Sequence, residues 1–364
     1  MRAYLLARRS VITMPKGDCV PEPPAADQWH TEEVTPIAAL ERVVHCLDRA
    51  QIGGFKTKAF LRALDVARGV GNDELVARAR LGTLTTVDGI GASTARVIAE
   101  AISGDSSYLN ELEASTAVVV SEAARPYVEA LRGDCHLHSR WSDGGATTEA
   151  MARTALSLGH DYIVMTDHSP RLTVAHGLSA ERLAQQVEEL AALNEAMAPF
   201  RILTGIEVDI LEDGSLDHDD AILAGLDVVV ASVHSKLRMD RDTMTQRMLR
   251  AVSSAHVDIL GHCTGRMIGK RQPSEFDAEA VFAACAEHGT AVEINCRPER
   301  LDPPLELLHV AVAAGCSFTI DSDAHATGQL EWLSFGAEIA AAAEIPIERI
   351  VNARPIDGLL AWVG

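Results

Sequence analysis

Short apolar runs alternate with amphipathic stretches from Gly133 to the end of the sequence. The first run leads into DCHLH, and the others are YIVMTDH (162–168), RILTGIEVDI (201–210), DVVVASVH (227–234), VDILGHC (257–263), TAVEIN (290–295) and SFTIDSDAH (317–325). Strands separated by helices pair in parallel, and runs that are apolar almost throughout are buried on both faces. The sequence therefore predicts an α/β fold over residues 133–364, a distorted (β/α) barrel with seven strands instead of eight.

A different pattern precedes the barrel. Over residues 35–102 apolar side chains recur at three- and four-residue spacing, in segments that stop at glycine. This periodicity predicts a small all-α domain. Its last segment, LTTVDGIGASTARVIAEAI, places Gly-Ile-Gly just ahead of the Ser and Thr where a new helix is expected to start.

The Gly-Ile-Gly stretch resembles the hairpin of a helix-hairpin-helix motif, which holds DNA backbone phosphate without reading sequence. Glycine permits a tight turn whose backbone N–H groups point outward at a helix N-terminus, where phosphate binds well. A turn with a purely structural role is the alternative. The resemblance implies phosphate contacts at Gly89, Ile90 and Gly91.

The remaining segments indicate the cellular setting. Residues 1–34 lack a sustained apolar core and are expected to form a disordered leader or an over-extended start, not a signal peptide. Residues 103–132 are expected to form a helical connector. No apolar run approaches the about 20 residues of a membrane span. Seven cysteines without a CxxC pair suit reduced thiols, so a cytoplasmic enzyme is expected.

The net charge of −20 is unevenly distributed. Residues 31–102 hold nine basic and nine acidic residues, whereas residues 103–364 hold 19 basic and 40 acidic ones. Such a balance excludes a protein that simply coats nucleic acid. Metal ions would cancel part of the acidic excess.

Almost every predicted strand ends in a side chain that can bind a metal ion. The strand ends and the loop after the first strand supply His136, His138, Asp143, His168, Glu207, His234, His262, Asp323 and His325. In a βα barrel the C-terminal ends of the strands meet on one face, where active sites lie. Any one of these residues could be structural, but nine at corresponding positions predict one crowded cavity. Divalent cations would offset its desolvation, and N/O ligands suit Zn²⁺, Mn²⁺ or Fe.

The ordered set HxH…D…TDH…E…SVH…GH…DxDAH resembles the PHP superfamily, named for polymerase and histidinol phosphatase. GIEVDILEDGSLD, GHCTGRMIGKR and EINCRPERLD are similar to the C-terminal PHP domain of bacterial family X DNA polymerases. The resemblance implies the PHP fold and three divalent metal ions. In that allotment one ion takes His136, His138, Glu207 and Asp323; Glu207 bridges to a second held by His234 and His262; and Asp143, His168 and His325 hold the third.

The chain departs from family X polymerases in one respect. Only 42 residues separate the Gly-Ile-Gly hairpin from Asp134, too few for a polymerase palm and fingers. No polymerase activity is therefore expected. One hairpin is present where such polymerases usually have two, which implies modest DNA affinity.

Clustered divalent metals bind phosphate oxygens and activate water, so hydrolysis of a phosphoester is the expected reaction. Glu207, Asp323, Arg266 and Arg297 are the expected catalytic residues, and Lys270, Arg271 and Arg300 are expected to hold DNA phosphates. A solvated surface is the alternative for these loop cations. The leading hypothesis is a DNA phosphodiesterase, a 3′–5′ exonuclease or a repair enzyme trimming 3′ ends. The alternatives are a phosphatase for a small phosphate ester such as histidinol phosphate, and a non-catalytic DNA-binding adaptor.

Overall fold

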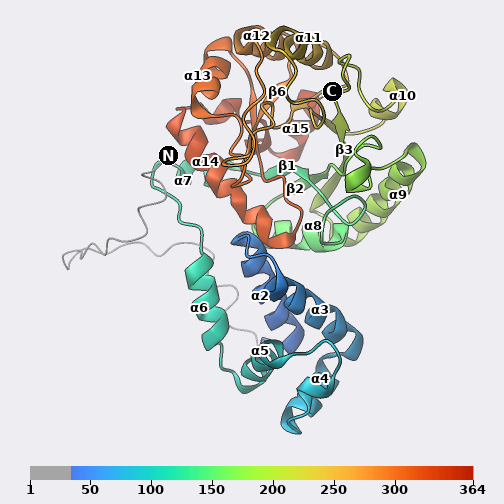
Figure 1. Ribbon diagram of the computed structural model, residues 1–364, viewed down its shortest axis with the longest axis vertical. Helices are drawn as coiled ribbons and strands as arrows, with labels where there is room; N and C mark the ends of the chain where they lie inside the picture. The colour runs from blue at the N-terminus through green and yellow to red at the C-terminus, as the bar shows by residue number, and fades with distance from the viewer. Residues whose placement is uncertain (1–33, 364) are drawn as a thin grey trace, which may run out of the picture.

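The structure, a computed structural model, describes residues 34–363. The leader predicted for residues 1–34 lies outside the described residues except for its last position. Two parts follow one another along the chain, a helical region and a seven-stranded barrel (Figure 1).

The helical region has its own core. Its elements are α2 (Pro36–Arg49), α3 (Phe55–Val70), α4 (Asn72–Arg80), the 3₁₀ turn η2 (Leu84–Thr86), α5 (Ala92–Ser103) and α6 (Ser107–Thr116). Leu40, Phe60 and Ile98 from three different helices are buried together, and Leu109 and Leu112 of α6 join the same cluster. We therefore define the helical module as residues 36–116, which is longer than the domain predicted from periodicity. A short helix, α7 (Arg125–Ala130), leads into the barrel.

The barrel confirms the predicted fold. Its strands are β1 (Gly133–Leu137), β2 (Tyr162–Met165), β3 (Arg201–Asp209), β4 (Val228–Ser232), β5 (Ile259–Leu260), β6 (Ala291–Asn295) and β7 (Phe318–Asp321). They pair in parallel in the order β1 to β7, each with the next strand of the chain. The fifth is much shorter than the run that predicts it, so His262 lies in the loop beyond β5.

Helices cover the barrel between successive strands. They are α8 (Thr148–Ser157), α9 (Ala180–Met197), α10 (Asp220–Leu223), α11 (Arg241–Val252), α12 (Ala278–His288) and α13 (Leu305–Ala314). After β7 come the 3₁₀ helix η4 (Thr327–Trp332), α14 (Leu333–Ala342), the 3₁₀ turns η5 (Ile347–Arg349) and η6 (Val351–Ala353), and α15 (Ile356–Val363). Because the sheet is covered on both faces, apolar strand side chains such as Ile206, Val230 and Ile294 have no exposed surface.

The first and last strands are joined mainly by side chains. Leu137 forms a single parallel bridge with Ala324, and the Asp321 carboxylate accepts a hydrogen bond from the Cys135 N–H at 2.8 Å. The Asn352 amide donates to the Gly133 carbonyl at 3.0 Å and to the Ile320 carbonyl at 2.7 Å. The barrel is therefore nearly closed, with polar groups completing the ring between β7 and β1.

The helical module projects from one side of the barrel, with α2 nearest to it (Figure 1). The contact is made by η4, whose Trp332 indole donates to the Arg49 carbonyl at 2.9 Å. Within residues 34–363 no helix is long and apolar enough to cross a membrane.

Candidate metal centre

The site begins with the two histidines of β1 and the turn after it. Side chains on a strand alternate between faces, so His136 and His138 point the same way. Both are fully buried, and their ring centroids lie 5.2 Å apart. Leu137, between the two histidines, and Cys135, just before His136, point into the apolar core instead.

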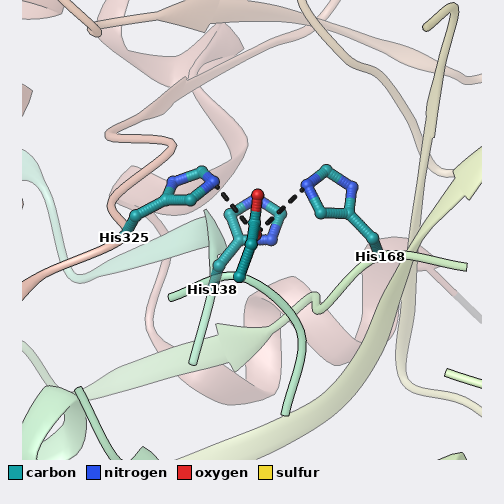
Figure 2. Close-up of side chains that lie close together, drawn as sticks. His138, His168 and His325 are labelled. Atoms are coloured by element: carbon teal, nitrogen blue, oxygen red, sulfur yellow. Dashed lines mark ion pairs between the residues drawn. The ribbon is translucent and has the colours of Figure 1, made fainter. Parts of the chain in front are cut away.

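One group of possible ligands consists of His138, Asp143, His168 and His325. Figure 2 shows the three imidazoles facing a common point. Asp143 Oδ1 lies 3.5 Å from His168 Nε2 and 3.3 Å from His325 Nε2. Each side chain comes from the end of a strand or from the loop after it, so the barrel topology brings residues from β1, β2 and β7 together.

Two further groups adjoin the first: His136, His138 and Asp323, and His168, Glu207 and His234. His138 Nε2 lies 3.5 Å from Asp323 Oδ1. His138 and His168 each belong to two groups, so the three clusters form one continuous site. The family-derived allotment gives His168 to a single ion, whereas the geometry lets it reach two.

Glu207 occupies the middle of the site. Its Oε1 lies 2.9 Å from His262 Nε2 and 3.2 Å from His234 Nε2. Its Oε2 lies 2.7 Å from His168 Nδ1 and 3.4 Å from His136 Nε2. A carboxylate with imidazoles at both oxygens is placed to serve two metal ions, and five of the other eight predicted ligands lie within 3.6 Å of it.

Several polar atoms in this cavity are buried without a hydrogen-bond partner. They include both carboxylate oxygens of Glu207 and the Nε2 atoms of His136, His138 and His234. Native proteins rarely leave such atoms unsatisfied, because desolvation without a partner costs about 1–3 kcal/mol each. Lone pairs aimed at a common cavity suit divalent cations, so these residues fit a metal centre.

The charges in the site are strongly coupled. Burial alone would raise the pKa of Glu207, but the facing His234 and His136 imidazoles hold it well below its usual range. Burial likewise disfavours charge on His234, but Glu207 and Asp209 raise its pKa to about 9. Burial and neighbouring imidazoles lower the pKa of His138 well below normal. Glu207 and His138 are thus already in the forms that bind metal. Burial disfavours charge on His136 too, but Glu293 and Glu207 raise its pKa well above normal, so His136 and His234 must each lose a proton.

A second layer of carboxylates orients the histidines. His136 Nδ1 donates to Glu293 Oε1 at 2.5 Å, and His234 Nδ1 donates to Asp209 Oδ1 at 2.7 Å. Such contacts turn the other ring nitrogen toward a metal. The sequence reasoning missed both carboxylates. Their signal is an acidic residue inside an otherwise apolar run, as in TAVEIN and GIEVDI.

We expect Glu293→Gln to weaken metal binding by about 10–100-fold, the usual loss when a second-layer partner is removed. Glutamine keeps the volume, and its amide oxygen can still accept one hydrogen bond, but the charge that favours the His136 tautomer is lost. Titration of the metal-free variant with Mn²⁺ measures the change. An unaltered isotherm would show that Glu293 has no orienting role.

Two of the five predicted loop cations reach the centre. Arg297 Nη1 lies 3.4 Å from Asp323 Oδ1 and 3.1 Å from His325 Nδ1. Arg300 Nε lies 3.2 Å from Asp323 Oδ2, and its Nη1 is buried without a hydrogen-bond partner. An unsatisfied guanidinium beside the metal ligands is suited to a phosphate oxygen.

The other three cations lie differently. Arg266 donates to the carbonyls of Arg300, at 2.8 Å, and Leu301. Arg271 donates to the Gly265 carbonyl at 2.7 Å, and Lys270 is exposed. Arg266 and Arg271 therefore use guanidinium N–H groups to hold the loops that follow β5 and β6.

The Gly-Ile-Gly stretch lies between η2 and α5. Gly89 has a φ of +95°, and a Cβ there would lie 2.9 Å from Val66 Cγ2. Ile90 is buried in the module core. Gly91 precedes α5 with a φ of −89°, and a Cβ there would meet nothing within 4 Å. Backbone freedom is thus required at Gly89 and not at Gly91, although the sequence suggested it for both.

A near-closed parallel barrel with buried carboxylates and imidazoles at its strand ends defines a barrel protein with a candidate metal centre. The domain model described as "PHP domain" matches residues 134–297. The chain therefore contains a PHP domain.

Relatives include DNA polymerase/3′-5′ exonuclease PolX of Bacillus subtilis (strain 168), 40% identical over 233 residues, which are 64% of this chain and 41% of PolX. A probable phosphatase of Thermoanaerobacter sp. (strain X514) is 35% identical over 168 residues, 44% of this chain and 63% of that one. The chain thus spans less than two thirds of either relative. A crystal structure of histidinol phosphate phosphatase from Lactococcus lactis, complexed with zinc, L-histidinol and phosphate, gives a TM-score of 0.42 at 17% identity, over 58% of this chain and 93% of that one.

Proposed function

We propose that the chain is a metal-dependent DNA phosphodiesterase, a 3′–5′ exonuclease or an enzyme that processes 3′ ends in repair. The observation that carries this proposal is the joining of a nine-residue metal site to a helical module with a basic, aromatic groove. The 40% identity to a protein named as a 3′-5′ exonuclease supports it.

The groove has a volume of about 710 Å³ and is lined by Phe55, Lys58, Arg62 and the Gly89–Gly91 turn. Phe55 is 96% exposed, which is unusual for a large apolar side chain. Exposed aromatic rings beside cations are typical of surfaces that bind single-stranded nucleic acid, because every base offers a face for stacking. Arg62 pairs with Asp88 at 2.8 Å, but both are solvated, so phosphate can compete for the guanidinium.

The start of α5 completes the groove. Gly91 supplies no side-chain cap, so the first N–H groups of α5 are open to a ligand. Helix N-termini with free N–H groups bind phosphate. Because these contacts touch only backbone phosphate, DNA binding should be independent of sequence and should weaken steeply with salt.

In the barrel, the predicted ligands would hold two or three divalent ions, of which Zn²⁺, Mn²⁺ and Fe suit the donor set. When bound, such ions stabilise charge on phosphate oxygens and lower the pKa of water. The protein's part is to position the phosphate. Arg300 Nη1 and the Arg297 guanidinium present N–H donors beside Asp323, where a phosphate oxygen can accept them.

A second candidate is a phosphatase for small phosphate esters. The 35% identity to a probable phosphatase favours it, and the acidic barrel would tolerate such a substrate. The deciding experiment offers the purified protein, with Mn²⁺ or Zn²⁺, labelled single- and double-stranded DNA beside histidinol phosphate. Cleavage of histidinol phosphate alone would overturn the DNA proposal, and no cleavage of either would leave the DNA-binding adaptor.

We expect Gly89→Ala to raise KM for long oligonucleotides about 10-fold, because a Cβ at positive φ strains the turn that presents the groove. Hydrolysis of bis-p-nitrophenyl phosphate should be unchanged, since the groove contributes to binding long DNA and not to the chemical step.

Gly104→Ala is the matched control. Gly104 is the C-cap residue of α5, the helix that follows the Gly89–Gly91 turn. It has a φ of +73° and no atom near its Cβ position, so the backbone strain of the alanine variant is similar but the groove is unchanged. Equal KM values for Gly89→Ala and Gly104→Ala would show that the groove does not hold DNA.

A further inference from the structure

The helical module docks on the segment that directly follows a metal ligand. His325 lies two residues before η4, and η4 is the part of the barrel that packs against α2. Trp332, at the end of η4, is fully buried, and its indole donates to the Arg49 carbonyl. The joint between the two parts therefore lies beside the metal centre.

An ion-pair network fastens this joint. Arg49 Nη1 lies 2.7 Å from each carboxylate oxygen of Glu331, and His45 Nε2 lies 2.5 Å from Oε1. Burial alone would raise the pKa of Glu331, but the contacts with His45 and Arg49 lower it. Arg49 also donates to Thr116 Oγ1 at 2.8 Å, which ties α6 to the same point.

The two backbones approach closely at Gly328. A Cβ on this residue would lie 2.0 Å from the His45 carbonyl oxygen and 2.9 Å from the Arg49 nitrogen. No side chain fits between backbone atoms at that distance. A glycine is therefore required for α2 to rest on η4.

Hydrogen bonds connect η4 to the metal ligands. The Gln329 side-chain oxygen accepts the His325 N–H at 2.7 Å. The His325 carbonyl in turn accepts the Gly145 N–H at 2.6 Å, which holds the loop of Asp143. Displacement of η4 would move both His325 and Asp143, two of the four side chains in the first ligand group.

A second set of contacts connects the helical module to the metal ligands through the loop that follows β6. The Gln51 amide, just beyond α2, donates to Glu299 Oε2, and the same oxygen lies 3.6 Å from Arg297 Nε. Arg297 contacts Asp323 and His325. The end of α2 thus touches both loops that border this side of the metal centre.

We infer that the helical module holds the metal centre in shape, with Gly328 and Glu331 as positioning residues for the His325–Asp143 ligand group. The inference goes beyond the proposed function, in which the module only grips DNA. It concerns metal binding and does not depend on which phosphoester is cleaved.

Gly328→Ala in the full chain tests the inference, because the added methyl group must push α2 away from η4. We expect the apparent affinity for the weakest-bound Mn²⁺ to fall about 10-fold, the lower end of the usual loss for indirect support of ligands. With bis-p-nitrophenyl phosphate, kcat at limiting Mn²⁺ should fall while KM stays constant, and saturating Mn²⁺ should restore kcat. Gly69→Ala, the same change in α3 with nothing near the Cβ position, is the control.

Glu331→Gln is the milder second variant, to be used if Gly328→Ala does not fold. It removes the charge that Arg49 and His45 share, and it should shift the Mn²⁺ isotherm in the same direction. Glu41→Gln is its control, because Glu41 pairs with Arg68 within the helical module at 2.9 Å. Isotherms of Glu331→Gln and wild type that superimpose would overturn the inference. A wild-type protein that binds Mn²⁺ but cleaves no DNA would instead overturn the proposed function.

Discussion

Replacing His138 by alanine should lower kcat by more than about 100-fold on every substrate, a loss of at least ~2.7 kcal/mol of transition-state stabilisation. His138 is a member of two of the three ligand groups, so its loss disturbs two metal positions at once. Asp323→Asn should have a similar effect. Asp323 has a φ of +51°, a backbone conformation that asparagine tolerates better than alanine, so this change removes the charge with little strain.

The measurement is steady-state hydrolysis of bis-p-nitrophenyl phosphate together with a circular dichroism melt. His160→Ala serves as the control, since His160 is also a buried histidine but belongs to none of the ligand groups. If either site variant kept more than about a tenth of wild-type kcat, equivalent to a loss below ~1.4 kcal/mol, its ligand role would be refuted.

Removal of metal should abolish hydrolysis and lower thermal stability together. A metal ion at a free concentration of a hundred times its Kd stabilises the folded state by about 2.7 kcal/mol. This corresponds to a rise in Tm of roughly 5–10 °C for a domain of this size. The empty site also leaves Glu207, Asp323 and Asp143 with only the imidazoles, Arg297 and Arg300 to offset their repulsion. Calorimetric melts before and after chelation, with elemental analysis, measure both effects.

The pH dependence of chelation follows from His234 and His136, because nearby carboxylates raise the pKa of both imidazoles despite their burial. The His234 pKa of about 9 in the metal-free protein means that this residue is protonated at neutral pH, and binding must displace that proton. Metal affinity should therefore rise with pH up to about 9, and chelation should be easiest at acidic pH. Full hydrolytic activity in verified metal-free protein would rule out the metal-dependent mechanism.

Sequence was informative where local pattern and barrel topology act together. The strand ends of a parallel barrel must meet on one face, so a metal-binding side chain at the end of almost every apolar run predicts a cluster without any knowledge of distances. His168 and His234 illustrate this, because they are 66 positions apart in the chain and their ring centroids lie 5.2 Å apart. The resemblance to PHP proteins added the grouping of ligands.

The sequence did not predict roles that depend on contacts between residues far apart in the chain, because such contacts leave no local pattern. Glu293 sits in a strand and orients His136, a pairing decided by which strands face each other across the barrel. The contact between Arg49 and Glu331 joins residues 282 positions apart, and neither stands in a recognisable motif. Arg266 follows a strand end just as Arg297 does, yet the loop conformation turns it toward backbone carbonyls.

The two sides of the joint between helical module and barrel come from opposite ends of the chain, which has a consequence for biosynthesis. The helical module has its own core and is complete at residue 116, whereas Glu331 and Trp332, on which it docks, are synthesised roughly 10–45 s later at usual translation rates. Asp323 and His325 emerge in the same late stretch. A growing chain would therefore complete the proposed DNA-binding module well before Asp323 and His325 complete the set of metal ligands.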